Sequence, residues 1–141
     1  MAVKCLIKGV HVVPMGMANA FLIEGDDGLA LIDAGFPGKQ AAVFGAIRGL
    51  GRSPDQLRYL IFTHGHPDHI GSAAAIVRET GPDRRLEPVA IDQPLTPGEI
   101  LPIAGGIEVI HTPGHCAGRA AVAPRTNAVR GRCVHEPHGP R

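Results

Sequence analysis

The residues best suited to chemistry lie in one short stretch, THGHPDHIG, at positions 63–71. It holds three of the chain's eight histidines and one of its seven aspartates within six residues, in the pattern H-x-H-x-D-H. The four candidate ligands are His64, His66, Asp68 and His69. Neutral imidazole is the commonest protein ligand for zinc and also suits iron. This spacing indicates a metal site, because ligands tethered on one short segment cost less to order.

A further histidine, His115, follows in the motif TPGH at positions 112–115. Pro113 and Gly114 predict a turn that redirects the chain toward the first loop. Three histidines with one open position for water are typical of a catalytic zinc site, whereas four protein ligands close a structural site. A bound metal lowers the pKa of such a water to about 7. We expect Asp68 to orient that water and to take its proton, as the catalytic base.

Other polar residues are weaker candidates for the site. Asp33, in LIDAG at the end of a predicted strand, is either a partner that holds a ligand loop, as metal sites usually require, or a carboxylate that caps a turn. His11 and His111 are predicted to be ordinary strand residues. Cys116, beside His115, is expected to act as a small buried hydrophobe rather than as a ligand.

The elements predicted around the motif explain how it is positioned. A buried apolar strand is predicted over 57–63, leading directly into the motif, and a single helix over 68–80. A ligand loop between a strand end and a helix start has a rigid base on both sides. Before the motif, the other predicted elements are strands over 3–13 broken at Gly9, a hairpin of 19–24 and 29–33 around Asp27-Gly28, a helix over 42–50, and a turn or short helical start at 53–55. After it, a brief strand is predicted at 89–91 and a second hairpin at 100–103 and 107–111.

Bulk composition restricts the class of protein. At 141 residues, with 44% hydrophobic and 19% charged residues, the chain is expected to form one globular domain. No apolar run reaches the roughly 20 residues that cross a bilayer, and the N-terminus lacks the pattern of a secretory signal. Three cysteines without C-x-x-C spacing favour a reducing compartment, so we expect a cytoplasmic protein with no membrane association.

Charge divides the chain near residue 119. Residues 1–118 carry nine Lys or Arg against twelve Asp or Glu, whereas residues 119–141 carry five Arg against one Glu. This basic tail, rich in Arg, Pro and Ala, contains no Leu, Ile, Phe or Tyr, so it cannot bury much apolar surface. We therefore expect a core over 1–118 and an irregular tail over 119–141.

Three motifs, in the same order, resemble those of the metallo-β-lactamase superfamily: LIDAG at 31–35, THGHPDHIG at 63–71 and HTPGHCAG at 111–118. The resemblance covers about residues 1–118. It implies an α+β fold, the αββα sandwich of that superfamily, with the N-terminal half largely present and the C-terminal half incomplete.

The resemblance also implies a role for each matching residue. The ligands of a first metal would be His64, His66 and His115, those of a second would be Asp68 and His69, and Asp33 would support the ligand loops. The implied metal is zinc, as one or two ions, with iron or manganese as alternatives.

The chain departs from the family's pattern after residue 118. The family's later Gly-Asp, whose carboxylate bridges the two metals, has no match, because no Asp follows Asp92, and Glu136 is not expected to replace it. The segment 81–95 is also short for the family. These departures favour the hypothesis of a truncated gene or an out-of-frame C-terminal part, which the coding DNA would test.

Three functions are compatible with these residues. The first is a zinc hydrolase in which a metal-activated water attacks an ester, a thioester or a similar small-molecule substrate. The second is an inactive metal-binding remnant of such a hydrolase, and the third is a mononuclear iron oxidoreductase of the same superfamily. A nucleic-acid partner is not expected, because residues 1–118 are acidic. Sheet surface left bare by an incomplete sandwich is expected to favour homo-oligomers.

Overall fold

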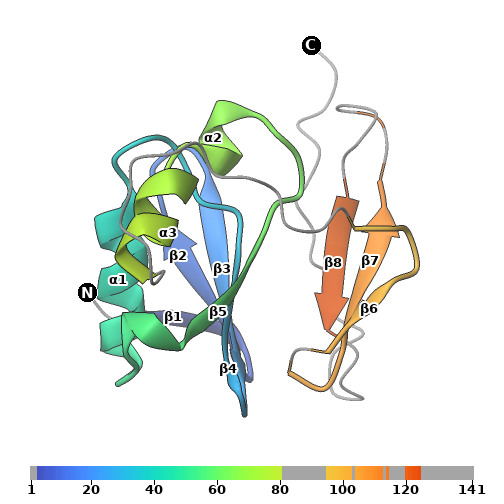
Figure 1. Cartoon of the computed structure of the whole chain (residues 1–141), viewed down its shortest axis with the longest axis horizontal. Helices are drawn as coiled ribbons and strands as arrows, with labels where there is room; N and C mark the ends of the chain where they lie inside the picture. The colour runs from blue at the N-terminus through green and yellow to red at the C-terminus, as the bar shows by residue number, and fades with distance from the viewer. Residues whose placement is uncertain (1–2, 81–94, 103, 113, 115–119, 125–141) are drawn as a thin grey trace.

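The computed structural model describes residues 3–80, 95–102, 104–112, 114 and 120–124. These residues form three layers, which Figure 1 shows from left to right as helices, a five-stranded sheet and a three-stranded sheet. The expected α+β class is confirmed, since one helical layer and both sheets of an αββα sandwich lie within the described residues. No helix in these ranges is long and apolar enough to cross a membrane.

The first sheet has the strand order β1-β2-β3-β4-β5. Its strands are β1 (Lys4–Ile7), β2 (Val10–Pro14), β3 (Asn19–Gly25), β4 (Gly28–Ile32) and β5 (Leu57–Ile61). Neighbouring strands are antiparallel except β4 and β5, which are parallel. The predicted break at Gly9, which has a φ of 78°, and the hairpin at Asp27-Gly28 are both confirmed.

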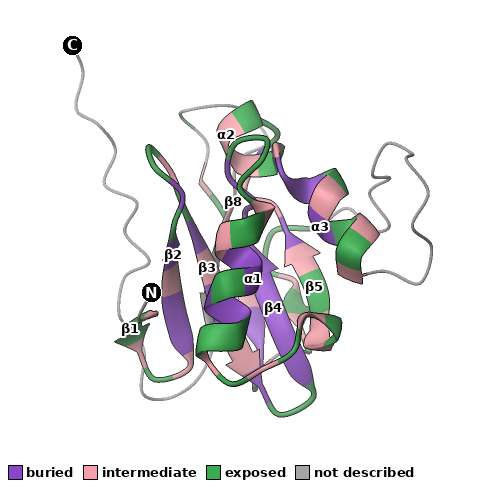
Figure 2. Cartoon of the chain, turned by 90° about the vertical axis from the view of Figure 1, so that its left-hand side faces the viewer, coloured by how far each residue is buried: buried purple, intermediate pink, exposed green. Residues whose placement is uncertain are grey.

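β4 lies at the centre of the core. All five of its residues are buried, because helices cover one face of the sheet and the second sheet covers the other (Figure 2). Leu29 and Leu31 pack on the helical side, whereas Ala30 and Ile32 pack with Ile107 of the second sheet. A strand buried on both faces is a rigid base for the residues that follow it.

The helical layer contains two main helices and two shorter turns. They are α1 (Gln40–Gly49), the 3-10 turn η1 (Pro54–Gln56), α2 (Pro67–Ile70) and α3 (Ala73–Thr80). The prediction of one helix over 68–80 is wrong, because Gly71 and Ser72 separate α2 from α3. Gly71 lies so close to Pro37 that a side chain there would overlap it, and the Ser72 hydroxyl bonds to the segment 36–39. Contacts with a distant segment therefore interrupt a continuous helical pattern.

β5 is not the buried strand that its apolar sequence predicts. Arg58 and Tyr59 are exposed, because β5 pairs with β4 on one side and has no second partner strand among the described residues. The strand becomes buried only at Ile61, from which the chain enters the ligand motif.

The second sheet has the order β6-β7-β8, and its strands are β6 (Ile100–Leu101), β7 (Ile107–His111) and β8 (Ala120–Pro124). The predicted second hairpin is confirmed. For residues 120–124 the prediction of an irregular tail is wrong, because they pair with β7 through the backbone, which needs no large side chains. Residues 125–141 and the strand predicted at 89–91 lie outside the described residues. The domain boundary at 118 stays a prediction.

Candidate metal centre

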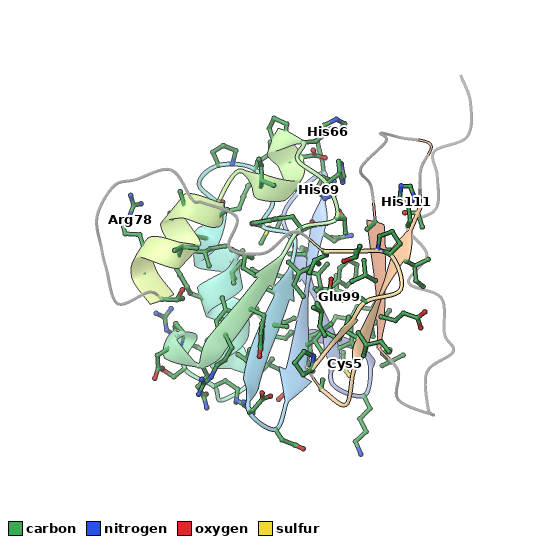
Figure 3. All side chains as sticks on the ribbon, turned by 45° about the vertical axis from the view of Figure 1, so that its right-hand side comes forward. Cys5, His66, His69, Arg78, Glu99 and His111 are labelled. Atoms are coloured by element: carbon green, nitrogen blue, oxygen red, sulfur yellow. The ribbon has the colours of Figure 1, made fainter. Side chains whose placement is uncertain are left out.

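The H-x-H-x-D-H motif lies at the end of the first sheet where β4 and β5 both end. Because these two strands are parallel, their carboxyl ends meet at one edge, and the segments 33–39 and 62–66 follow from there. Figure 3 shows His66 and His69 at this edge and His111 at the same end of the second sheet. We call this edge of the first sheet the metal edge.

Backbone hydrogen bonds hold α2 against the segment that follows β4. The Ala34 N donates to the His69 carbonyl over 2.6 Å, and the Gly71 N donates to the Gly35 carbonyl over 2.8 Å. These bonds join the helix that carries Asp68 and His69 to the most buried strand of the sheet. The two candidate ligands are therefore positioned by β4 as well as by β5.

Asp33 connects the two segments through its side chain. The residue is 4% exposed and has a positive φ of 63°, which Asp adopts more readily than most residues. Its carboxylate accepts from the Thr63 backbone N at 2.8 Å, from the Thr63 hydroxyl at 2.8 Å and from His69 Nδ1 at 2.7 Å. These contacts fit the alternative in which Asp33 holds the ligand loop, rather than the one in which it caps a turn.

The same carboxylate decides which nitrogen of each imidazole is available to a metal. An ionised carboxylate only accepts, so the Thr63 hydroxyl donates its single proton to Asp33. The hydroxyl oxygen, 3.0 Å from His64 Nδ1, then accepts the proton of that nitrogen. His69 Nδ1 donates directly to Asp33. Both neutral rings therefore keep a lone pair on Nε2, as a metal ligand must.

Three of the predicted ligands come together at the metal edge. One ligand atom each from His64, Asp68 and His69 lies within 4.8 Å of the other two. His69 Nε2 is 3.3 Å from Asp68 Oδ2, and the ring centroids of His64 and His69 are 4.0 Å apart. His66 is exposed at the start of α2, with its ring centroid 4.7 Å from that of His64. The donor types and spacing of the first three residues fit a divalent first-row metal ion.

His115 and the adjacent Cys116 lie outside the described residues, but both flanks of their segment are placed. His111 and Ala120 pair at the ends of β7 and β8. The Ala120 N donates to the Thr63 carbonyl over 2.9 Å, which ties the second sheet to the residue before the motif. Ala120 therefore lies beside Thr63, and the role of His115 as a ligand stays a prediction.

His11 lies on β2, two strands away from β4, where it pairs with Leu22 of β3. Its ring is buried, and its Nε2 is 2.6 Å from Glu24 Oε1 on the neighbouring strand β3. Arg52 Nη1 lies 3.9 Å from the other oxygen of Glu24. This placement agrees with the prediction of a strand residue outside the metal site.

Thr63 and Ser72 have roles that the sequence alone did not predict. Thr63 links Asp33 to His64, as described above, and the Ser72 hydroxyl donates to the Phe36 carbonyl over 2.5 Å. No local pattern signals either contact, because the partners lie 30 and 36 positions away along the chain. A hydroxyl residue directly beside a ligand motif is the only hint that the sequence carries.

Known proteins resemble the chain in both sequence and fold. Residues 13–105 match the family model described as the metallo-beta-lactamase superfamily. The human metallo-beta-lactamase domain-containing protein 1 is 36% identical over 108 residues, which cover 71% of this chain and 39% of that protein. This chain belongs to the metallo-beta-lactamase superfamily. The resemblance predicted from the three motifs is thereby confirmed.

Two further relatives show how much of a superfamily protein the chain represents. The probable metallo-hydrolase YflN of Bacillus subtilis is 34% identical over 73 residues, 50% of this chain and 28% of that protein. The metallo-beta-lactamase GOB-18 of Elizabethkingia meningoseptica shares the fold with a TM-score of 0.76 at 19% identity, over 86% of this chain and 55% of its own. The chain thus spans between 28% and 55% of these three relatives. Superfamily members typically bind metal ions, and the group formed by His64, Asp68 and His69 can hold one here.

Proposed function

We propose that this chain is a metal-dependent hydrolase that cleaves an ester, a thioester or a similar small-molecule substrate with a metal-activated water. One observation carries this proposal: ligand atoms of His64, Asp68 and His69 lie within 4.8 Å of one another, and Asp33 holds both imidazoles in the tautomer that binds a metal. The relative named as a probable metallo-hydrolase supports the same class of reaction.

The residues of the motif divide between two ions in this proposal. We assign the first ion to His64, His66 and His115 and the second to Asp68 and His69, with zinc as the preferred metal and iron or manganese as alternatives. When bound, such an ion supplies a water of lowered pKa and polarises the substrate carbonyl. Asp68 is only partly buried, so a water molecule can reach its carboxylate, which takes the proton.

A mononuclear iron oxidoreductase is the second candidate. Two histidines and one carboxylate that leave open coordination positions are the ligand set of non-haem iron(II) oxygenases. The group formed by His64, Asp68 and His69 has this composition. An inactive metal-binding remnant of such a hydrolase is the third alternative.

We further propose a small-molecule substrate, no nucleic-acid or membrane partner, and a cytoplasmic location. The acidic balance of residues 1–118 supports the first two, since phosphate backbones are bound by basic surfaces. Homo-oligomers through exposed sheet surface stay a prediction. The exposed Ile100 and Ile110 in the second sheet lie on the surface that this prediction concerns.

The deciding experiment measures metal content and hydrolysis on the same preparation of the full chain. We expect one or two zinc ions per chain and turnover of p-nitrophenyl acetate or of an acyl thioester. At saturating zinc, Asp68→Asn is expected to lower kcat by about 10²- to 10⁴-fold, because it removes the proton acceptor as well as a metal ligand. Asp26→Asn, in the exposed turn between β3 and β4 at the far end of the sheet, is the matched control and is expected to leave kcat unchanged.

Other outcomes separate the alternatives. One iron per chain with oxygen consumption and no ester hydrolysis would favour the oxidoreductase. A folded chain that retains no metal would favour the remnant. Cleavage of single-stranded DNA in place of the esters would contradict the small-molecule substrate.

A further inference from the structure

One group of ligands in the structure cuts across the two metal sites assigned above. His64 belongs to the first site, and Asp68 and His69 belong to the second, yet their ligand atoms all lie within 4.8 Å of one another. We propose that these three residues form a capture site, which binds one divalent metal ion without His66 or His115. This capture site rests on the same metal-binding role as the proposed function and specifies which residues hold an ion when only one is bound.

The spacing of Asp68 and His69 already suits a shared ion. Two ligands of a tetrahedral ion with bonds of 2.0–2.1 Å are separated by roughly 3.4 Å. His69 Nε2 and Asp68 Oδ2 are 3.3 Å apart. With the His69 proton on Nδ1, both atoms are acceptors, and a cation between them removes the repulsion of two electron-rich atoms at this distance. This part of the site needs almost no movement to bind an ion.

The two imidazoles of the capture site are oriented by one buried carboxylate. Asp33 bonds to His69 directly and to His64 through the Thr63 hydroxyl. Folding has therefore already removed most of the rotational freedom of both rings, so binding an ion costs less conformational entropy. Asp33 itself is fixed by its backbone N, which donates to the Ile61 carbonyl over 2.8 Å.

The segment 36–39 completes the frame behind α2. The Ser72 hydroxyl, buried at the start of α3, donates to the Phe36 carbonyl and accepts from the Lys39 N at 2.8 Å. Together with the contact of Gly71 against Pro37, these bonds prevent α2 from moving away from the sheet. The position of His64 relative to Asp68 and His69 is thus fixed by the fold before a metal ion binds.

Charge also favours the capture site over the site made of three histidines. His64, His66 and His115 are all neutral as ligands, whereas the capture site contains the carboxylate of Asp68. The buried carboxylate of Asp33 lies 2.7 Å from His69 and adds a second negative charge behind the ligands. A divalent cation is attracted more strongly to this arrangement than to neutral rings alone. His66, by contrast, is exposed at the start of a four-residue helix.

Cobalt(II) titration of the metal-stripped full chain tests the capture site, with visible absorption and elemental analysis as readouts. His66→Ala and His115→Ala are each expected to retain one ion, with Kd raised less than about fivefold. His64→Ala, Asp68→Asn and His69→Gln are each expected to raise Kd by about 100-fold or more, because each removes a metal–ligand bond. The matched control His111→Ala, at the exposed end of β7, is expected to bind as the wild type does.

Far-UV circular dichroism of each variant separates loss of a ligand from loss of the fold, and Asp68→Asn preserves side-chain shape in case His69→Gln unfolds. Loss of the ion from His115→Ala or His66→Ala, as complete as from His64→Ala, would overturn the capture site. If the capture site is overturned in this way but the wild-type chain hydrolyses esters, the proposed function stands without the capture site. An ion retained by His66→Ala and His115→Ala in a chain with no hydrolysis supports the capture site and contradicts the proposed function.

Discussion

One histidine–carboxylate pair lies at the metal edge and another lies between strands β2 and β3, and they differ in what surrounds them. At the metal edge His69 Nδ1 is 2.7 Å from Asp33, and between β2 and β3 His11 Nε2 is 2.6 Å from Glu24. The second nitrogen of His69 faces Asp68 at 3.3 Å, whereas that of His11 is buried with no hydrogen-bond partner among the residues that the structure describes. A carboxylate beside a histidine therefore does not by itself indicate a metal site. A further ligand near the second nitrogen of the ring, as Asp68 is for His69, does indicate one.

The two carboxylates also differ in how water surrounds them. The Asp33 side chain is 6% exposed and accepts bonds from both Thr63 and His69. The Glu24 side chain is 32% exposed, so water can supply part of its hydrogen bonding. The cost of removing each carboxylate should differ accordingly, because a buried group left without its partner cannot turn to solvent.

The largest effect is expected from removing these carboxylates one at a time. Asp33→Ala leaves several buried donors without an acceptor, so we expect it to lower the free energy of unfolding by about 3–5 kcal/mol and to abolish metal binding. Glu24→Ala leaves Nε2 of the buried His11 without its partner, so we expect it to cost about 1–3 kcal/mol and to leave metal binding intact. Urea unfolding of the metal-stripped chain and cobalt titration measure both quantities. Equal losses of stability and of metal binding in the two variants would contradict the contrast between the two pairs.

A smaller effect is expected from the metal ion itself. At a free metal concentration of 100 times Kd, binding to the native state alone adds about 2.7 kcal/mol to the free energy of unfolding. We expect this gain in the wild type and in His11→Gln, and we expect His69→Gln to lose it. Thermal unfolding with and without a chelator measures the difference. A chelator that destabilises His69→Gln as much as His11→Gln would show that the metal binds elsewhere.

The smallest effect is expected from Thr63→Val, which removes the hydroxyl between Asp33 and His64. One hydrogen-bonded hydroxyl contributes about 0.5–1.5 kcal/mol to stability, and loss of a partner behind a metal ligand weakens metal binding by about 10-fold or more. Thr80→Val is the matched control, because its hydroxyl donates only within α3, to the Ile76 carbonyl at 2.9 Å. An unchanged metal Kd in Thr63→Val would mean that Asp33 does not orient His64.

Much of the fold was predictable from local patterns. The break at Gly9, the hairpin at Asp27-Gly28 and the second hairpin are encoded by neighbouring residues, so they could be predicted without knowledge of the rest of the chain. The predictions were wrong where contacts with a distant segment determine the local structure. Contacts with Pro37 and its neighbours interrupt the helix predicted over 68–80. Residues 120–124 form a strand because they pair with β7, although their composition indicates an irregular tail.

The sequence by itself determined the family and the types of ligand, because H-x-H-x-D-H is contained in six adjacent residues and its chemistry does not depend on distant parts of the chain. The family resemblance also implied that Asp33 supports the ligand loops, whereas the residues alone left a turn-capping role open. Only the tertiary structure decided that His64, rather than His66, joins Asp68 and His69 in one group. The physical reason is that Asp33 and Thr63, 30 positions apart, meet at the parallel ends of β4 and β5 and orient the rings of His64 and His69 together.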